Sequence, residues 1–184
     1  MMKRSQRDAV LISQIENMIA KGSWCGETHI QKAAYFLQAL LGVPLEFDFI
    51  LYKHGPFSFD LSDEITALRA DALLRYQARP YPYGSSIVPT EEGHSFLDGY
   101  PKTLKRYADQ ISFVADTLGN MGVAELERLA TALYVSLNQS GQSGKRAEQI
   151  TKLKPHITSE EANLAVQKID EIIEKAKEIH LSES

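Results

Sequence analysis

The fold prediction starts from one stretch of the sequence, Phe49-Ile50-Leu51-Tyr52-Lys53-His54-Gly55-Pro56-Phe57-Ser58. Its first four residues are apolar and rich in aromatic and β-branched types, which favours a short buried strand. The dipeptide Gly55-Pro56 predicts a sharp turn, because Gly permits a positive φ and Pro fixes φ at about −65°. Ser58 is a candidate N-cap for a helix with apolar residues at helical spacing, Leu61, Ile65 and Leu68. The stretch therefore predicts a strand, a turn and a helix.

Two helical patterns precede this stretch. The first spans residues 8–20 and ends at Gly22, which suits the left-handed position after a helix. The second opens at Thr28, which with Gln31 matches the capping box, and continues to Leu41 as an unbroken apolar stripe. Such a stripe predicts a helix central to the core.

A β-hairpin is predicted after the helix that Ser58 opens. Residues 73–77 and 85–88 have the composition of short strands, and the loop 78–84 between them holds two prolines and a glycine. Thr90 then caps another helix, with acidic residues in its first turn. Helix, strand, helix, hairpin and helix is the order of a winged-helix unit, with residues 73–88 as the wing.

The remainder of the chain is predicted to be helical. Apolar stripes cover residues 104–118 and 126–137, and a Ser/Gly/Gln-rich segment at 138–145 has the composition of a flexible loop. Thr158 and Glu161 form a second capping box, and the apolar seam of the helix that follows favours packing against the body over a free coiled coil. The predicted fold class is α+β and predominantly helical. We expect a single domain over 1–184, with a winged-helix-like core (8–98), a small β-hairpin and a helical extension (101–184) packed on the core.

Composition narrows the function classes. The chain has 24 acidic and 20 basic residues, a balance that disfavours nucleic-acid binding. Its single cysteine, Cys25, excludes an intramolecular disulfide and a Cys-based zinc site, and the five histidines lack metal-ligand spacing. The sequence holds neither a Gly-rich phosphate loop nor a nucleophile elbow, so we expect no enzyme activity, no metal and no cofactor. No apolar run reaches the ~20 residues that span a bilayer, and the expected location is the cytoplasm.

Two segments resemble the Panacea (SocA-like) antitoxin domain family and related uncharacterised phage-associated proteins. They are Gln31-Lys32-Ala33-Ala34-Tyr35-Phe36-Leu37-Gln38 and the turn 52–58, followed by a helix and a Leu-Leu strand entry. The late segment Lys154-Pro155-His156-Ile157-Thr158 is similar to one in the related proteins. The resemblance implies a prokaryotic or phage-borne protein that binds another protein, neutralising a toxin or delivering it to a protease. Members commonly have Tyr where this chain has His54, so a role for that hydroxyl does not carry over.

The candidate partner-binding residues lie in the turn and in the wing loop. They are Tyr52, Lys53, His54, Gly55, Pro56, Phe57 and Phe59 of the turn, with Arg79, Tyr81 and Tyr83 of the wing. Gly55 and Pro56 are expected to shape the backbone, and Tyr and Arg are enriched at interface hot spots. Lys32 has two interpretations: its stem covers apolar surface with the charge in water, which we favour, or it donates a hydrogen bond to the turn carbonyls. Trp24 is interpreted as a core residue.

Two other function classes stay open at this point. A winged-helix DNA-binding regulator would need cations on the helix before the wing, but that helix carries Asp60, Asp63 and Glu64 against Arg69. This alternative requires the wing and residues 145–154 to form one continuous basic face. A small-molecule or enzymatic role would require a deep pocket around Lys32 and His54.

Overall fold

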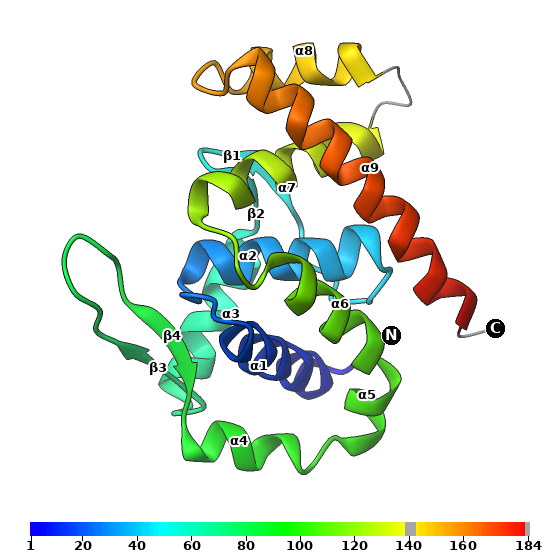
Figure 1. Ribbon diagram of the computed structural model, residues 1–184. Coiled ribbons are helices and arrows are strands. Elements are labelled where there is room, and N and C mark those ends of the chain that lie inside the picture. Colours follow the sequence, from blue (N-terminus) through cyan, green and yellow to red (C-terminus); the bar gives the residue numbers. More distant parts are fainter. Residues whose placement is uncertain (139–142, 183–184) are drawn as a thin grey trace.

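The computed structural model describes residues 1–138 and 143–182, and it is mostly helical with two small hairpins (Figure 1). The helices are α1 (Arg4–Ala20), α2 (Glu27–Tyr35) with its π-helical continuation η1 (Phe36–Leu40), α3 (Phe59–Ala70), α4 (Glu91–Leu97), α5 (Pro101–Arg106), α6 (Ala108–Leu118), α7 (Val123–Asn138), α8 (Ser143–Leu153) and α9 (Ser159–Ser182). The strands are β1 (Ile50–Tyr52), β2 (Gly55–Phe57), β3 (Leu74–Gln77) and β4 (Ser86–Pro89). The predicted α+β, predominantly helical class is confirmed.

Helices α1 and α2 lie at the centre of the fold. α1 packs against α6, α4, α5 and β4, whereas α2 packs against α7 and β2. Gly22 follows α1 with φ +89°, as predicted. The predicted capping box at Thr28 is wrong: Gly26 is the N-cap of α2, and its N–H donates to Nδ1 of His29. Gln31 is turned away from the helix start because it binds the backbone of Ser58.

The stretch 49–58 folds as a β-hairpin. β1 and β2 pair antiparallel, with Ile50 opposite Phe57 and Tyr52 opposite Gly55, and the turn residues are Lys53 and His54. The prediction of a buried strand followed by a turn at Gly55-Pro56 is therefore wrong. β1 is an edge strand whose side chains at Ile50 and Tyr52 are exposed, while β2 is covered by α2 and α7. Ser58 caps α3 as predicted, accepting a hydrogen bond from the N–H of Leu61.

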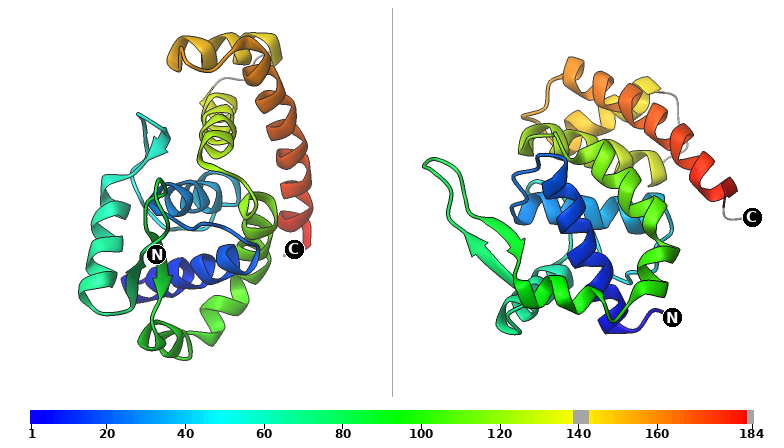
Figure 2. Two further views of the ribbon diagram at one scale, coloured as in Figure 1. Left: turned by 60° about the vertical axis from the view of Figure 1, so that its left-hand side comes forward. Right: turned by 60° about the horizontal axis from the view of Figure 1, so that its bottom comes forward.

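The second hairpin confirms the two strands predicted within residues 73–88, and we keep the name wing for this hairpin as a label only. β3 pairs antiparallel with β4, and Thr90 caps α4 through the N–H of Gly93. This hairpin extends away from the helices in Figures 1 and 2. In the described part of the chain the two hairpins form separate two-stranded sheets, so β1 does not extend the sheet of the wing.

The C-terminal helices pack on one another and on the core. The predicted stripe 104–118 is two helices, because the chain breaks at Tyr107 (φ −109°, ψ 15°). Residues 138 and 143–145 of the loop predicted at 138–145 are helical instead, and residues 139–142 lie outside the described residues. The second capping box is confirmed, and the seam of α9 packs against α7, α8 and α6 (Figure 2). In the described ranges, no helix has the length and apolar character needed to cross a membrane.

Candidate functional site: the anchored hairpin

We call residues 50–57 and the side chains that hold them the anchored hairpin. Lys32 of α2 is 1% exposed, and its Nζ donates to the carbonyl oxygen of Pro56 at 2.9 Å. The favoured interpretation of Lys32, with its charge in water, is therefore wrong, and the alternative hydrogen bond to the turn is correct. Burial lowers the pKa of Lys32 to about 8, because the interior disfavours the ammonium, while Glu127 acts in the opposite direction.

Gln31 holds the residue that follows β2. Its side-chain Nε2 donates to the carbonyl oxygen of Ser58 at 2.8 Å, and its Oε1 accepts from the N–H of Ser58 at 2.9 Å. Both side chains are completely buried. Because buried backbone groups cost free energy when unpaired, these bonds fix the chain between β2 and α3. Adjacent residues of α2, Gln31 and Lys32, thus bind the backbone of one short segment.

Gly55 allows α7 to pass close to the hairpin. Its φ is +87°, in the left-handed region that favours glycine. A Cβ placed on Gly55 would lie 3.2 Å from Oγ1 of Thr131 and 3.5 Å from the carbonyl oxygen of Glu127, both in α7. The positive φ expected at Gly55 is confirmed, and the close contact with α7 adds a second requirement for glycine.

The turn of the hairpin is held by the segment between α8 and α9. Nζ of Lys154 donates to the carbonyl oxygens of Lys53, at 2.6 Å, and of Tyr52. Lys154 is itself largely buried, and burial lowers its pKa. The late segment that contributed to the family resemblance is therefore brought directly onto the turn.

Glu127 of α7 lies among the basic groups around this turn. Its carboxylate is 3.0 Å from Nε2 of His156, 3.7 Å from Nδ1 of His54 and 3.9 Å from Nζ of Lys154. It also interacts electrostatically with Lys32. Sequence reasoning missed Glu127, because neighbouring residues on α7 give no sign that a carboxylate at this position faces two lysines from other segments.

Aromatic side chains form an exposed patch on the outer side of the hairpin. The ring centroids of Tyr52, Phe57 and Phe59 lie 5.1–5.6 Å apart in each pair. Tyr52 is 51% and Phe59 55% exposed, and Ile50 beside them on β1 is 43% exposed. We call Ile50, Tyr52, Phe57 and Phe59 the aromatic patch. Of the turn residues predicted from the sequence, Lys53 and His54 are also exposed, whereas Gly55 and Pro56 are buried.

A small cavity of about 170 Å³ adjoins the patch. Lys32, Tyr52, Lys53, His54 and Phe57 line it, together with Glu27 and Thr28. Small-molecule sites typically enclose about 300–1,000 Å³, so this cavity is smaller than the deep pocket that the small-molecule alternative requires.

The wing residues are brought together with Trp24 and not with the hairpin. The guanidinium of Arg79 lies 5.0 Å from the ring centroid of Trp24, and its Nε donates to Oγ of Ser86 at 2.7 Å. The ring of Tyr83 also packs against Trp24, with the two ring centroids 4.5 Å apart. Tyr81 is 96% exposed. Trp24 is half-buried at the surface, so its interpretation as a core residue is wrong. Figure 1 shows the wing and the β1–β2 hairpin leaving the body at different places.

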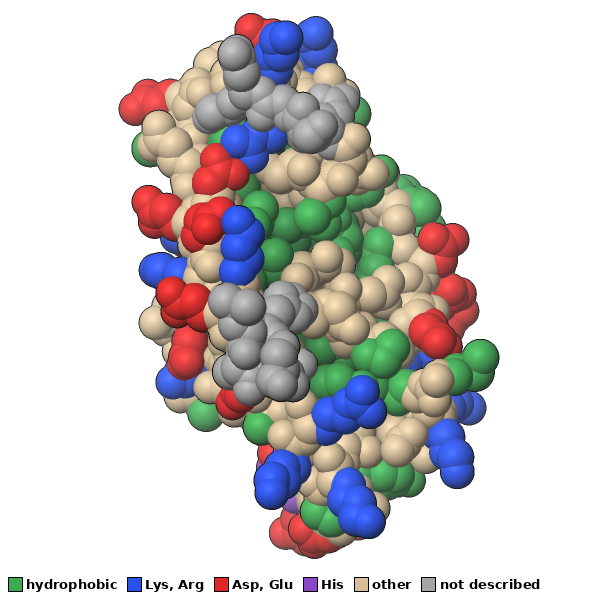
Figure 3. Space-filling view, turned by 90° about the vertical axis from the view of Figure 1, so that its right-hand side faces the viewer, with side chains coloured by type: hydrophobic (Ala, Val, Ile, Leu, Met, Phe, Trp, Pro, Cys, Tyr) green, Lys and Arg blue, Asp and Glu red, His purple; other side chains and the backbone are tan. Residues whose placement is uncertain are grey.

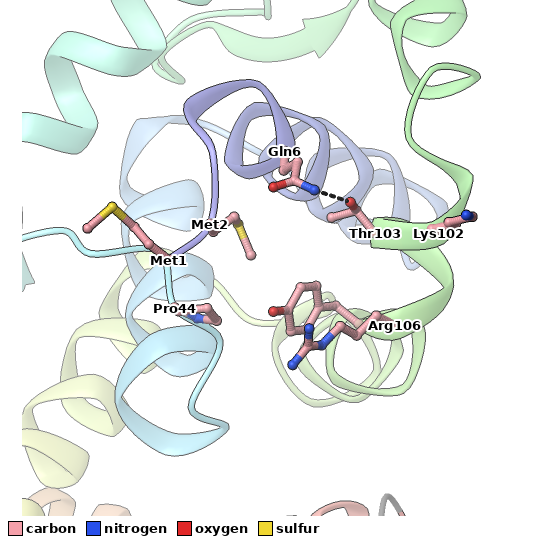
Figure 4. Close-up of a pocket in the computed structure, with 8 residues that line it drawn as sticks. Met1, Met2, Gln6, Pro44, Lys102, Thr103 and Arg106 are labelled. Atoms are coloured by element: carbon pink, nitrogen blue, oxygen red, sulfur yellow. Dashed lines mark hydrogen bonds between the residues drawn. The ribbon is translucent and has the colours of Figure 1, made fainter.

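A larger cavity of about 360 Å³ lies between α1 and α5 (Figure 4). Gln6 donates to Oγ1 of Thr103 across it at 3.2 Å. Its cations, Lys102 and Arg106, are exposed, and Lys102 extends away from the other labelled side chains in Figure 4. The cavity therefore holds no buried cation arranged to receive an anion.

The basic face required for DNA binding is interrupted. Arg146 forms two hydrogen bonds with Asp170, and Lys154 is buried. On α3, Asp60 and Asp63 are exposed.

Charges of both signs also mix on the face with α9. Figure 3 shows red and blue side chains interspersed along one edge there, with Lys and Arg gathered toward the end that holds α5. Of the four basic side chains in residues 145–154, Arg146 and Lys154 are therefore not available to a basic surface shared with the wing.

No protein-family model matches this sequence, and a comparison with curated proteins found no significant match. Within the described residues, no group of three or more His, Cys, Asp or Glu side chains is placed to hold a metal ion.

The buried position of Lys32 predicts a stability that rises with pH. Its pKa is about 8 in the folded protein, against an ordinary value of 10.5. Between these values the unfolded chain keeps a proton that the folded protein has released, so raising the pH favours folding. Through Lys32 alone, the free energy of unfolding should rise by about 3 kcal/mol as the pH goes from about 7 to about 11.

Urea denaturation of the wild type and of Lys32→Met tests this dependence. The free energy of unfolding of the wild type minus that of the variant should increase by that amount over the range. Subtraction removes the contributions of other groups, such as Cys25, whose pKa burial raises to about 12. A difference that does not change with pH would contradict the lowered pKa.

Proposed function

We propose that this protein is a non-enzymatic, antitoxin-like protein-binding module that acts in the cytoplasm of a prokaryote or during phage infection. Its cognate partner is a toxin, or a client delivered to a protease. The aromatic patch on the anchored hairpin supports the proposal most strongly, and the resemblance to Panacea antitoxins supplies the class of partner. We also propose that residues 8–98 form a winged-helix-like core, because the order of their helices and strands is compatible with that fold.

Exposed aromatic side chains on a well-held backbone suit protein recognition. Aromatic residues dominate interface hot spots because they bury a large apolar area with few rotatable bonds. Tyr52 and Phe59 expose about half of their surface. The backbone beneath them is held by hydrogen bonds that the buried side chains of Lys32, Gln31 and Lys154 donate. A backbone fixed before binding loses less conformational entropy when the partner docks.

The double variant Tyr52→Ala/Phe59→Ala tests the patch. We expect its affinity for the partner to fall about 1,000-fold, since two truncated hot spots at about 2 kcal/mol each cost about 4 kcal/mol together. The partner to test first is a protein encoded beside this one, assayed by isothermal titration calorimetry and by rescue of growth on co-expression. Leu164→Ala is the matched control, because Leu164 is 59% exposed on α9 and lines a cavity to which no residue of the hairpin contributes.

Equal affinity of the wild type and Tyr52→Ala/Phe59→Ala for the partner, with full rescue of growth by both, would remove the aromatic patch from the interface.

Tyr81→Ala tests the wing in the same assay, where the loss of a contact residue should lower the affinity for the partner.

A further inference from the structure

A cavity of about 470 Å³ lies between the loop of the wing and the loop that joins α6 and α7. Its lining combines aromatic and apolar side chains with several glycines: Gly22, Trp24, His29, Tyr83, Gly84, Gly119, Asn120, Met121, Gly122 and Val123. This volume lies within the range of about 300–1,000 Å³ that is typical of ligand sites. None of the sequence motifs pointed to it.

One wall of the cavity is tied together by Trp24. Its indole Nε1–H donates to the carbonyl oxygen of Gly84 at 2.9 Å, which joins the start of α2 to the loop of the wing. The rings of Trp24 and Tyr83 are in tilted contact, with centroids 4.5 Å apart. The aromatic wall is thus formed before any ligand arrives.

The opposite side is fixed by His29. Nδ1 of His29 accepts from the N–H of Gly26, and the ring also bonds to the backbone of Met121 in the α6–α7 loop. Burial lowers the pKa of His29 below its ordinary value, which favours the neutral imidazole. Among the described residues that line the cavity, none is Lys, Arg, Asp or Glu. A charged ligand would lose hydration here and would find no ionic partner among the residues that line the cavity.

We propose that this cavity binds an uncharged apolar side chain, aromatic or branched aliphatic, of the protein partner. The inference rests on the proposed function, because the partner supplies the occupant. Tyr83 belongs both to the cavity and to the predicted contact residues of the wing, and the 96% exposed Tyr81 is its near neighbour. Val123, 44% exposed, offers further apolar surface at the other loop. The cavity therefore continues the wing surface inward, which is where a partner's anchoring side chain would enter.

The test uses Trp24 itself, since it is the only tryptophan of the chain and its fluorescence reports on this cavity. The probes are N-acetyl-leucinamide and N-acetyl-phenylalaninamide, with N-acetyl-lysinamide and N-acetyl-aspartamide as charged controls. We expect a saturable change in Trp24 fluorescence with the two apolar probes and at least about tenfold weaker binding of the charged ones. A response that never saturates, or that is equal for all four probes, overturns the proposal.

Two variants are designed to block the cavity. Gly84 and Gly122 line it, and a Cβ at either position meets no atom within 4 Å, so we choose Gly84→Leu/Gly122→Leu as the first variant. Gly144→Leu in α8, where a Cβ also meets no atom within 4 Å, is the matched control. Val123→Asp places a charge at the cavity and suits the first turn of α7, where an acidic residue is favourable. Each blocking variant should weaken probe binding at least about tenfold while the control keeps wild-type affinity; unchanged probe affinity in either one contradicts the site.

The partner assay separates this inference from the proposed function. Both blocking variants should also lose affinity for the partner at least about tenfold. If the probes bind but the blocked variants retain the partner fully, the occupant is a small molecule and the inference is wrong, while the aromatic patch stands. If Tyr52→Ala/Phe59→Ala retains the partner, the proposed use of the patch fails whatever the probes do.

Discussion

Gly55→Val is expected to destabilise the protein by about 4 kcal/mol, which combines about 1–3 kcal/mol for an unfavourable φ with a similar cost for overpacking. The φ of +87° is unfavourable for a β-branched residue, and the new Cβ would press on Oγ1 of Thr131 at 3.2 Å. The hydrogen bond from Lys32 to Pro56 would shift with the strand.

Thermal and urea denaturation, followed by circular dichroism, measure this effect. Gly84→Val is the matched control, because Gly84 lies outside the positive-φ region and a Cβ there meets no atom within 4 Å. The control should change stability by less than about 1 kcal/mol. Equal melting temperatures for Gly55→Val and the wild type would show that α7 does not hold the hairpin in the way described.

Glu127→Gln is expected to cost about 3 kcal/mol of stability, since removing one partner of a buried ionic group leaves uncompensated charge. Glu127 is 7% exposed, and its negative charge offsets the positive charges of Lys32 and Lys154, which repel each other. The amide keeps the size of the side chain but not its charge. The pKa of Lys32 should therefore fall further in the variant.

The control for this substitution is Glu125→Gln, two residues earlier on α7. Glu125 pairs with Lys168 at 2.6 Å, but both side chains are nearly half exposed, and such pairs contribute about 0–1 kcal/mol. Urea denaturation at pH 7 should show a larger loss of unfolding free energy for Glu127→Gln than for Glu125→Gln. A loss for Glu127→Gln no greater than that for Glu125→Gln would place Glu127 outside the electrostatics of the hairpin.

Local signals in the sequence predicted much of the secondary structure. Ser58, Thr90 and Thr158 were identified as caps because capping depends on residues three positions apart. The first hairpin was missed because Gly55 and Pro56 are typical of turns, whereas here tertiary contacts with α2 and α7 hold them in a strand. The break at Tyr107 was missed because the apolar spacing continues through it.

The candidate site could be predicted only where one segment carries it. Gly55 and the exposed aromatic residues lie within eight residues of each other, and the positive φ of Gly55 follows from residue type. Lys32 was placed correctly only as the second interpretation, since its burial depends on a carbonyl 24 residues away. Glu127 and Lys154 reach the hairpin from distant helices, and neither spacing nor composition encodes such contacts.

The central claim is that the aromatic patch binds a specific protein. The most direct measurement is a tagged pull-down from the native host with the wild type, Leu164→Ala and Tyr52→Ala/Phe59→Ala, with mass spectrometry of retained proteins and an assay for nucleic acid. We expect one neighbour-encoded protein to be retained in equal amounts by the wild type and Leu164→Ala and to be lost from the double variant. Retention of that protein by all three, or retention of DNA with no protein, would contradict it.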